Sequence, residues 1–346
     1  MSAVGERGNG TIPIDAPGPL SETVVDLLGR LPTDPGVGAA ARAAVELAAA
    51  VEEPLADDDL QLALYLLYEL HYRSFPGVHA GWEWNPELLR LRAALEEGFF
   101  GTLEETMPAP GAAEPEAVGD ELFRIEAADE GPSLSRFAET QADVERFREI
   151  VVHRSLYQLK ESDPHSWAIP RLRGAVKTAL LEVQHDEYGG GQAERMHSVL
   201  FARTMRGLGL EDGENHYLDR VPGVTLATVN LMSGFGLHRS RRGAIVGQLA
   251  MVEMTSARPS RAYGNGLRRL GLDAEVTDFY DEHVEADAVH ENIAAYDLAG
   301  GLARAEPELA PDILFGARAF LFLEQRFARH LLSAWERGES SLLRPL

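Results

Sequence analysis

Apolar residues recur every three to four positions along most of this chain, which is the spacing of a buried helix face. The pattern runs from Val37 to about Glu105, resumes near Leu134, and continues in segments to LFGARAFLFLEQRFARHLLSAWERG close to the C-terminus. Alternating strand patterns are scarce, and no segment is repeated. The sequence therefore predicts an all-α protein.

Breaks in this pattern suggest four segments. Residues 1–35 are rich in Gly, Pro and polar residues, so we expect a tail without fixed structure. Residues 36–106 form an N-terminal helical region, and MPAPGAAEPEAVGD (107–120) has the composition of a linker or long loop. The remaining residues, 121–346, form the main helical domain.

Composition excludes several classes of protein. The net charge of −23 argues against nucleic acid as a partner, because phosphate binding needs a basic surface. No apolar run reaches the length of a membrane span, and the N-terminus lacks the pattern of a secretory signal, so we expect a cytoplasmic protein that contacts no membrane. The chain has no cysteine, so a metal ion would need His, Asp and Glu ligands.

The segment FYDEHVEADAVHENI (279–293) carries the strongest chemical signal. His283, Asp287 and His290 stand at positions i, i+4 and i+7, which fall on one stripe of a helix. A lone buried histidine usually has a structural role, but two imidazoles and a carboxylate in register are what a divalent transition metal requires. We interpret the three residues as metal ligands that need partners from elsewhere in the chain.

A second set of candidates lies in LLEVQHDEYGGGQAERMHSVLF (181–202). Glu194 and His197 form Glu-x-x-His, the i, i+3 pair that diiron helical bundles use, and Glu187 lies seven residues before Glu194. The three intervening glycines would each cost roughly 1 kcal/mol inside a helix. Either the helix breaks at the glycines or a close backbone approach needs them, and both arrangements keep Glu187 near the site.

A third helix should supply another carboxylate. The segment VVHRSLYQLKESDPH must stop or kink at Asp163-Pro164. Glu161 shares a face with Tyr157 and Ile150, so an apolar stripe ends in an acid. Without the other two clusters, a solvated acid at a helix end would be the better interpretation of Glu161.

Taken together, these residues resemble a known family. The ordered set, with the surrounding text ESDPHSWAIPRLRG, DEYGGG and FYDEHVEADAVHE, is similar to the haem-oxygenase-like diiron oxidases, also called iron-containing redox enzymes. The resemblance covers about residues 130 to 300. It implies seven iron ligands, which are Glu161, Glu187, Glu194, His197, His283, Asp287 and His290.

The resemblance also implies a fold and a reaction class. The expected fold is a haem-oxygenase-like helical bundle with an additional N-terminal helical region. The expected cofactor is two iron ions cycling between Fe²⁺ and Fe³⁺ with O2 as cosubstrate, although manganese in place of one iron stays open. Members that oxygenate nitrogen have a further carboxylate ligand where Glu187 stands, so we expect N-oxygenation of a small amine or amino acid in a biosynthetic pathway.

Several alternatives remain at this level. The same cofactor could catalyse oxidative C–C cleavage or desaturation of an amino or fatty acid, and a non-catalytic iron-binding or scaffold protein is a second alternative. Oxygenation would need a small-molecule substrate and an external electron donor, and the sequence is compatible with a homodimer. Glu253, in the apolar segment GAIVGQLAMVEMTS, is expected to be structural, with a place in a pocket as the less favoured alternative.

Overall fold

The structure, a computed structural model, describes residues 14–107 and 114–346, except the side chains of residues 286–289. Every regular element within these ranges is helical, which confirms the all-α prediction. In the described part of the chain, no helix is both long enough and apolar enough to cross a membrane. Residues 1–13 of the predicted tail and 108–113 of the predicted linker lie outside the described residues.

The chain divides into two compact units. Among the described residues, the first contains residues 14–107 and 218–230, and the second contains residues 114–217 and 231–346. The elements that lie wholly in the first unit are α1 (Pro19–Leu28), α2 (Val37–Ala48), α3 (Asp58–Glu69), the 3₁₀ turn η1 (Ala80–Trp82) and α4 (Pro86–Thr106). Helix α11 (Gly223–Leu237) begins in the first unit and ends in the second.

Helix α1 corrects the expectation that residues 1–35 lack fixed structure. Asp59 of α3 accepts hydrogen bonds from the backbone N–H groups of Leu20 (2.9 Å) and Ser21 (2.7 Å), so it satisfies two of the donors that a helix start leaves unpaired. The apolar face of α1, including Leu20 and Val24, is buried. The composition of residues 1–35 did not reveal this helix, because Asp59, which caps its start, lies almost forty residues away in the sequence.

The stretch 218–230 also departs from the predicted boundaries, since it joins the first unit rather than the main domain. The Asn230 amide donates to the backbone carbonyl (2.9 Å) and the side-chain oxygen (2.7 Å) of Gln61, and both residues are buried. A Cβ on Gly223 would come within 2.8 Å of the Ala56 carbonyl oxygen, so this approach requires glycine.

The second unit holds most of the helices. Its elements after η2 (Pro115–Ala117) are α5 (Val118–Ala127), α6 (Leu134–Thr140), α7 (Val144–Gln158), α8 (Asp163–Ser166), η3 (Ile169–Arg171), α9 (Gly174–Glu187), η4 (Gly189–Gly191), η5 (Ala193–Arg195), α10 (His197–Gly207), η6 (Arg239–Arg241), α12 (Arg242–Arg269), α13 (Ala274–Asn292), the π-helix η7 (Ile293–Ala299), α14 (Gly300–Ala305), η8 (Pro307–Leu309) and α15 (Ala310–Glu336).

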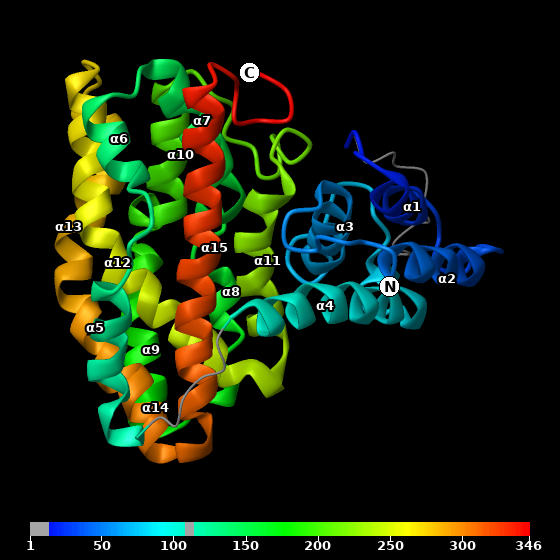
Figure 1. The fold of residues 1–346 in the computed structure, drawn as a ribbon, viewed down its shortest axis with the longest axis horizontal. Coiled ribbons are helices and arrows are strands. Elements are labelled where there is room, and N and C mark those ends of the chain that lie inside the picture. The colour runs from blue at the N-terminus through cyan, green and yellow to red at the C-terminus, as the bar shows by residue number, and fades with distance from the viewer. Residues whose placement is uncertain (1–13, 108–113) are drawn as a thin grey trace, which may run out of the picture. The chain divides into compact units, whose positions relative to one another are not determined.

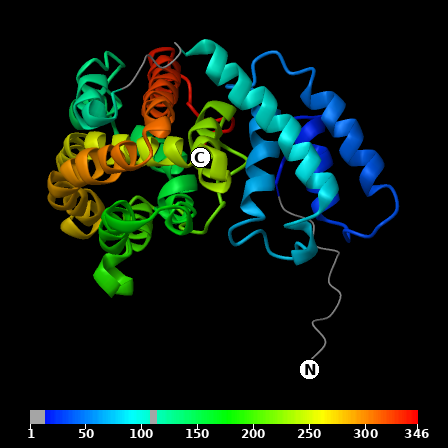
Figure 2. The same ribbon diagram turned by 90° about the horizontal axis from the view of Figure 1, so that it is seen from below.

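Helix α12 is the central element of the second unit, and it packs along both α13 and α15 (Figure 1). Seen from below, α12 and α13 lie between α15 and the green helices that include α9 and α10 (Figure 2). Helices α12 and α15 cross at glycines, because a Cβ on Gly247 would overlap the Ile313 carbonyl and one on Gly316 would overlap the Ala244 carbonyl. This backbone contact fixes α12, which carries Glu253, against the bundle.

Acidification should weaken the second unit through its buried neutral histidines. Burial lowers the pKa of His165 to about 4, although its hydrogen bond to Gln248 (2.6 Å) opposes the shift. A pKa below that of the unfolded chain means that the stability His165 contributes is complete above about pH 6.5 and is lost as the pH falls toward 4. We expect His165→Gln to reduce the loss of unfolding free energy between about pH 7.5 and 5.5 by about 1 kcal/mol.

Urea unfolding at the two pH values measures this change. His185→Gln is the control, because His185 is exposed on α9 rather than buried. Equal pH dependence in the wild type and His165→Gln would show that His165 is not held in its neutral form.

Candidate metal centre

Four buried side chains from separate segments of the second unit converge on one point. They are Glu161 in the turn after α7, Glu187 at the end of α9, His197 at the start of α10, and His283 in the middle of α13. One ligand atom from each lies within 4.8 Å of the others. Two carboxylates and two imidazoles at this separation form a donor set suited to iron, manganese or zinc.

A strained turn positions Glu161. Helix α7 ends at Gln158, earlier than the Asp163-Pro164 boundary that the sequence suggested, and Ser162 adopts a left-handed conformation with φ +67°. Such a conformation is costly for a residue other than glycine and needs support from its surroundings. Tyr188 supplies part of it, because its hydroxyl donates to Asp163 Oδ1 (2.8 Å) and so ties the turn to the end of α9.

The three glycines after Glu187 break the helix, which answers the question that their sequence raised. Gly189, Gly190 and Gly191 all have positive φ, at 72°, 61° and 85°. A Cβ on Gly189 would approach the Met196 nitrogen to 2.6 Å, so the chain there also passes too close for a side chain. Helix α9 therefore ends at Glu187. The Glu187 carboxylate is buried, and it does not share a continuous helical face with Glu194.

Hydrogen bonding orients the histidines toward the carboxylates. His283 Nδ1 donates to the Phe279 carbonyl oxygen (2.8 Å), and its Nε2 lies 3.5 Å from Glu161 Oε1. His197 Nδ1 lies 3.1 Å from Glu187 Oε2, and the centroids of the two imidazole rings are 4.3 Å apart. This arrangement is the one that metal-ligating histidines adopt when a backbone carbonyl fixes the tautomer.

Glu187 also belongs to a second cluster, with Glu253 of α12 and His290 of α13. His290 Nδ1 lies 3.2 Å from Glu253 Oε2, and its Nε2 lies 2.9 Å from Asp186 Oδ2. Glu253 is 4% exposed, whereas the Asp186 side chain is 50% exposed, so Nδ1 faces the interior and Nε2 faces outward. Glu187 is thus shared by two neighbouring groups of metal-ligating side chains.

The electrostatics reflect carboxylates confined in a buried space. Burial raises the pKa of Glu161, while His283 opposes the shift. For Glu187, burial acts in the same direction, but His197, His283 and His290 outweigh it and lower the pKa to about 2. Burial lowers the pKa of His290, yet Glu253 and Asp186 raise it to about 9. The histidines around Glu187 therefore favour its negatively charged form.

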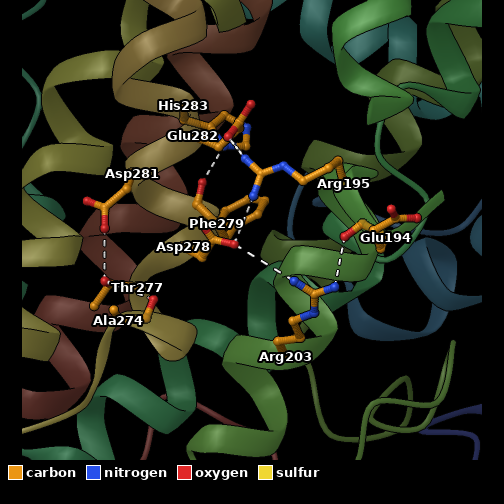
Figure 3. Close-up of polar contacts among 10 residues, drawn as sticks. All are labelled: Glu194, Arg195, Arg203, Ala274, Thr277, Asp278, Phe279, Asp281, Glu282 and His283. Atoms are coloured by element: carbon orange, nitrogen blue, oxygen red, sulfur yellow. Dashed lines mark hydrogen bonds and ion pairs between the residues drawn. The ribbon is translucent and has the colours of Figure 1, made fainter. Parts of the chain in front are cut away.

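The structure brings together most of the residues predicted from sequence. Glu161, Glu187, His197, His283 and His290 are gathered in the two clusters. Glu194 is not, because it lies exposed in η5, outside α10, and its side chain points away from His283 (Figure 3). The side chain of Asp287 lies outside the described residues, so its role stays a prediction.

Glu253 is the residue that sequence reasoning ranked too low. A buried acid in the apolar segment of α12 was the available signal, but no second Asp, Glu or His at helical spacing accompanied it. Its partners come from α9 and α13, which the sequence alone does not place beside α12.

The described residues fit a metal ion. Glu161 Oε2 and His197 Nε2 are fully buried and have no hydrogen-bond partner among the described groups, although buried polar atoms are normally paired. Both atoms belong to residues of the first cluster, where a cation would offset the cost of burying the carboxylates.

Comparisons with known proteins agree with this geometry. The model of the family described as iron-containing redox enzyme matches residues 148–325, a range that includes both clusters. The chain belongs to this family, with a haem-oxygenase-like all-α fold, which confirms the resemblance seen in the sequence. The family assignment makes the protein an oxidoreductase that contains iron.

A particular relative can be named. The chain is 26% identical over 239 residues to a nitrosourea synthase of Streptomyces achromogenes subsp. streptozoticus, with 68% of this chain and 50% of the relative covered. The chain thus spans about half the length of the relative that it matches.

Because Glu187 belongs to both clusters, its loss should weaken metal binding at each of them. We expect Glu187→Gln to weaken binding of both equivalents of Co(II) by at least about a hundredfold, since even residues that only support ligands cost roughly 10- to 100-fold. Glu253→Gln should weaken one equivalent only. Isothermal titration calorimetry under anaerobic conditions measures Co(II) binding by the two variants. Glu182→Gln is the matched control, because Glu182 is an exposed acid on α9. Two tight equivalents in Glu187→Gln would contradict the shared site.

Proposed function

We propose that this protein is an O2-activating non-haem diiron oxygenase that N-oxygenates a small amine or amino acid in a biosynthetic pathway. The observation that carries the proposal is Glu187, a buried carboxylate shared by two adjacent clusters of ligands. In the N-oxygenating members that the sequence resembles, an additional carboxylate stands at this position. The similarity to a nitrosourea synthase also supports N-oxygenation, because a nitrosourea contains an oxidised nitrogen.

The described residues would hold two iron ions in the neighbouring clusters. Glu161, His197 and His283 would bind the first and Glu253 and His290 the second, with Glu187 between them. We propose that Asp287, three residues before His290, adds a ligand from the same helix. When bound, the two irons supply the reduction of O2 with electrons that an external donor replenishes.

The protein's own residues contribute orientation and a dry environment. Phe279 accepts the Nδ1–H of His283 and so keeps Nε2 available as a ligand. The ring of Phe279 packs 4.4 Å from that of His283 and 5.0 Å from that of Phe201, and both phenylalanines are buried. This apolar wall excludes water from one side of the first cluster, where water would compete with a substrate nitrogen.

The count of charges is consistent with two divalent ions. Glu161, Glu187 and Glu253 contribute three negative charges among the described buried ligands, and Asp287 would contribute a fourth. Two Fe²⁺ ions with neutral histidines would then form a centre without net charge. Because a buried net charge is costly, this balance supports occupation by two ions rather than one.

The proposal predicts O2-dependent oxygen transfer to nitrogen. Protein loaded anaerobically with two equivalents of Fe²⁺ should, when mixed with isotopically labelled O2, an electron donor and a panel of amines and amino acids, give a product with one labelled oxygen on nitrogen. Mass spectrometry of the products reads this out. His283→Ala should abolish the labelled product, because it removes a ligand of the first cluster.

The products also separate the alternatives. An alkene or a fragment that has lost carbon would favour desaturation or C–C cleavage by the same cofactor. Tight iron binding without O2 consumption, with any compound of the panel, would favour a non-catalytic iron protein.

A further inference from the structure

A pair of buried polar residues near the metal centre has two side-chain atoms without a hydrogen-bond partner. His165 lies on α8 and Gln248 on α12, and one hydrogen bond joins His165 Nε2 to Gln248 Oε1 (2.6 Å). The two residues are only 1% and 0% exposed. The other two polar atoms, His165 Nδ1 and Gln248 Nε2, are also buried, and neither has a partner among the described groups. Since buried polar atoms are normally paired, a partner for these two atoms is missing.

The two unpaired atoms have complementary hydrogen-bonding roles. Because His165 Nε2 donates to the Gln248 oxygen, His165 Nδ1 carries a lone pair that can accept, and the Gln248 amide nitrogen can donate. The opposite orientation of the amide would exchange these roles, since His165 Nδ1–H would then donate and the Gln248 oxygen would accept. In either orientation the pair offers one donor and one acceptor to a third group.

Other polar residues beside His165 are fully engaged. Ser166 Oγ contacts both Gln184 Oε1 (3.1 Å) and the Tyr188 hydroxyl (3.1 Å), and that hydroxyl donates to Asp163 Oδ1 (2.8 Å). The hydrogen-bond network around α8 is therefore complete at Ser166 and incomplete at His165. A ligand group or a buried water molecule would complete it.

Tyr157 of α7 lies close to this pair and to the metal centre. Its ring is edge-on to the imidazole ring of His165, with the centroids 6.4 Å apart. Burial raises the pKa of Tyr157, and the carboxylates of Glu161, Glu187 and Glu253 raise it further, so the hydroxyl is within electrostatic reach of both clusters. A small molecule with one end at the metal and the other end beyond Tyr157 would therefore reach the pair.

The chemistry of the pair selects a neutral group. Burial lowers the pKa of His165 to about 4, so both side chains are uncharged near neutral pH. A charged group placed against two uncharged side chains in the interior would keep most of its desolvation cost. An amide is neutral and carries an N–H donor beside a carbonyl acceptor, so it would pair with both unpaired atoms.

We propose that His165 and Gln248 bind the end of the substrate that does not react, and that this end is a neutral group of the amide class. The substrate then carries its reacting amine at the metal centre and its amide at the pair. The inference rests on the proposed function and narrows the small amine or amino acid to one with a second, neutral hydrogen-bonding group. His165 and Gln248 are then specificity-determining residues, because both touch the substrate.

Binding of a series of amino amides tests the proposal. The probes are linear amines with a terminal carboxamide and one to five methylene groups, each compared with the alkylamine of equal chain length. Isothermal titration calorimetry of the Co(II)-loaded protein gives the dissociation constants. At least one amino amide should bind at least about tenfold more tightly than its alkylamine, because it pairs two atoms that otherwise stay unpaired. Equal binding of amide and alkylamine at every length, or no binding of any probe, would overturn the proposal.

Substitutions show whether the pair gives this preference. Gln248→Met should reduce the ratio of the two dissociation constants to about twofold or less, while both Co(II) equivalents still bind. The double variant His165→Leu with Gln248→Met should do the same. Because it removes both partners of the hydrogen bond, it should fold even if the single variant does not. Gln61→Met, which removes a buried glutamine of the first unit, is the matched control and should keep the wild-type ratio.

The outcomes also separate this inference from the proposed function. A preference for the amide that survives in the double variant would show that the amide contacts the bound metal rather than the pair, and would contradict only the inference. A wild-type protein that binds no Co(II) would instead contradict the metal centre on which the proposed function depends.

Discussion

Several carboxylates buried within a few ångströms of one another form the constraint on which this structure depends. Each unpaired charge in such a site costs several kcal/mol, and like charges at close range raise the cost further. Here the histidines carry part of the compensation, since they outweigh burial at Glu187 and lower its pKa to about 2. Cations would supply the rest, and the placement of Glu187 between two clusters is what a pair of neighbouring ions would require.

The site takes its ligands from two kinds of backbone. Glu253 comes from the middle of α12, where the glycine crossing with α15 fixes the backbone. Glu161 and Glu187, in contrast, lie at helix ends that a left-handed turn and three glycines separate from their neighbours. The site thus combines one ligand from a packed helix with ligands from the turns and helix ends around it.

Sequence periodicity was sufficient for the fold class and for the ligands that share one continuous helix. His283 and His290 lie seven residues apart on α13, so their common face follows from helix geometry alone. Glu194 lies outside the two clusters because α10 begins only at His197, so the predicted i, i+3 helix pair does not form and Glu194 stands in the turn η5. Glu253 was underrated because its partners are distant in sequence, and only tertiary packing brings them together.

Anomalous X-ray diffraction from crystals grown anaerobically with Mn²⁺ or Fe²⁺ tests the central claim most directly, because it locates bound ions without reference to activity. The account predicts two anomalous peaks. One should lie among Glu161, Glu187, His197 and His283, and the other among Glu187, Glu253 and His290. Fully ordered side chains at these positions with no anomalous peak among them would contradict it.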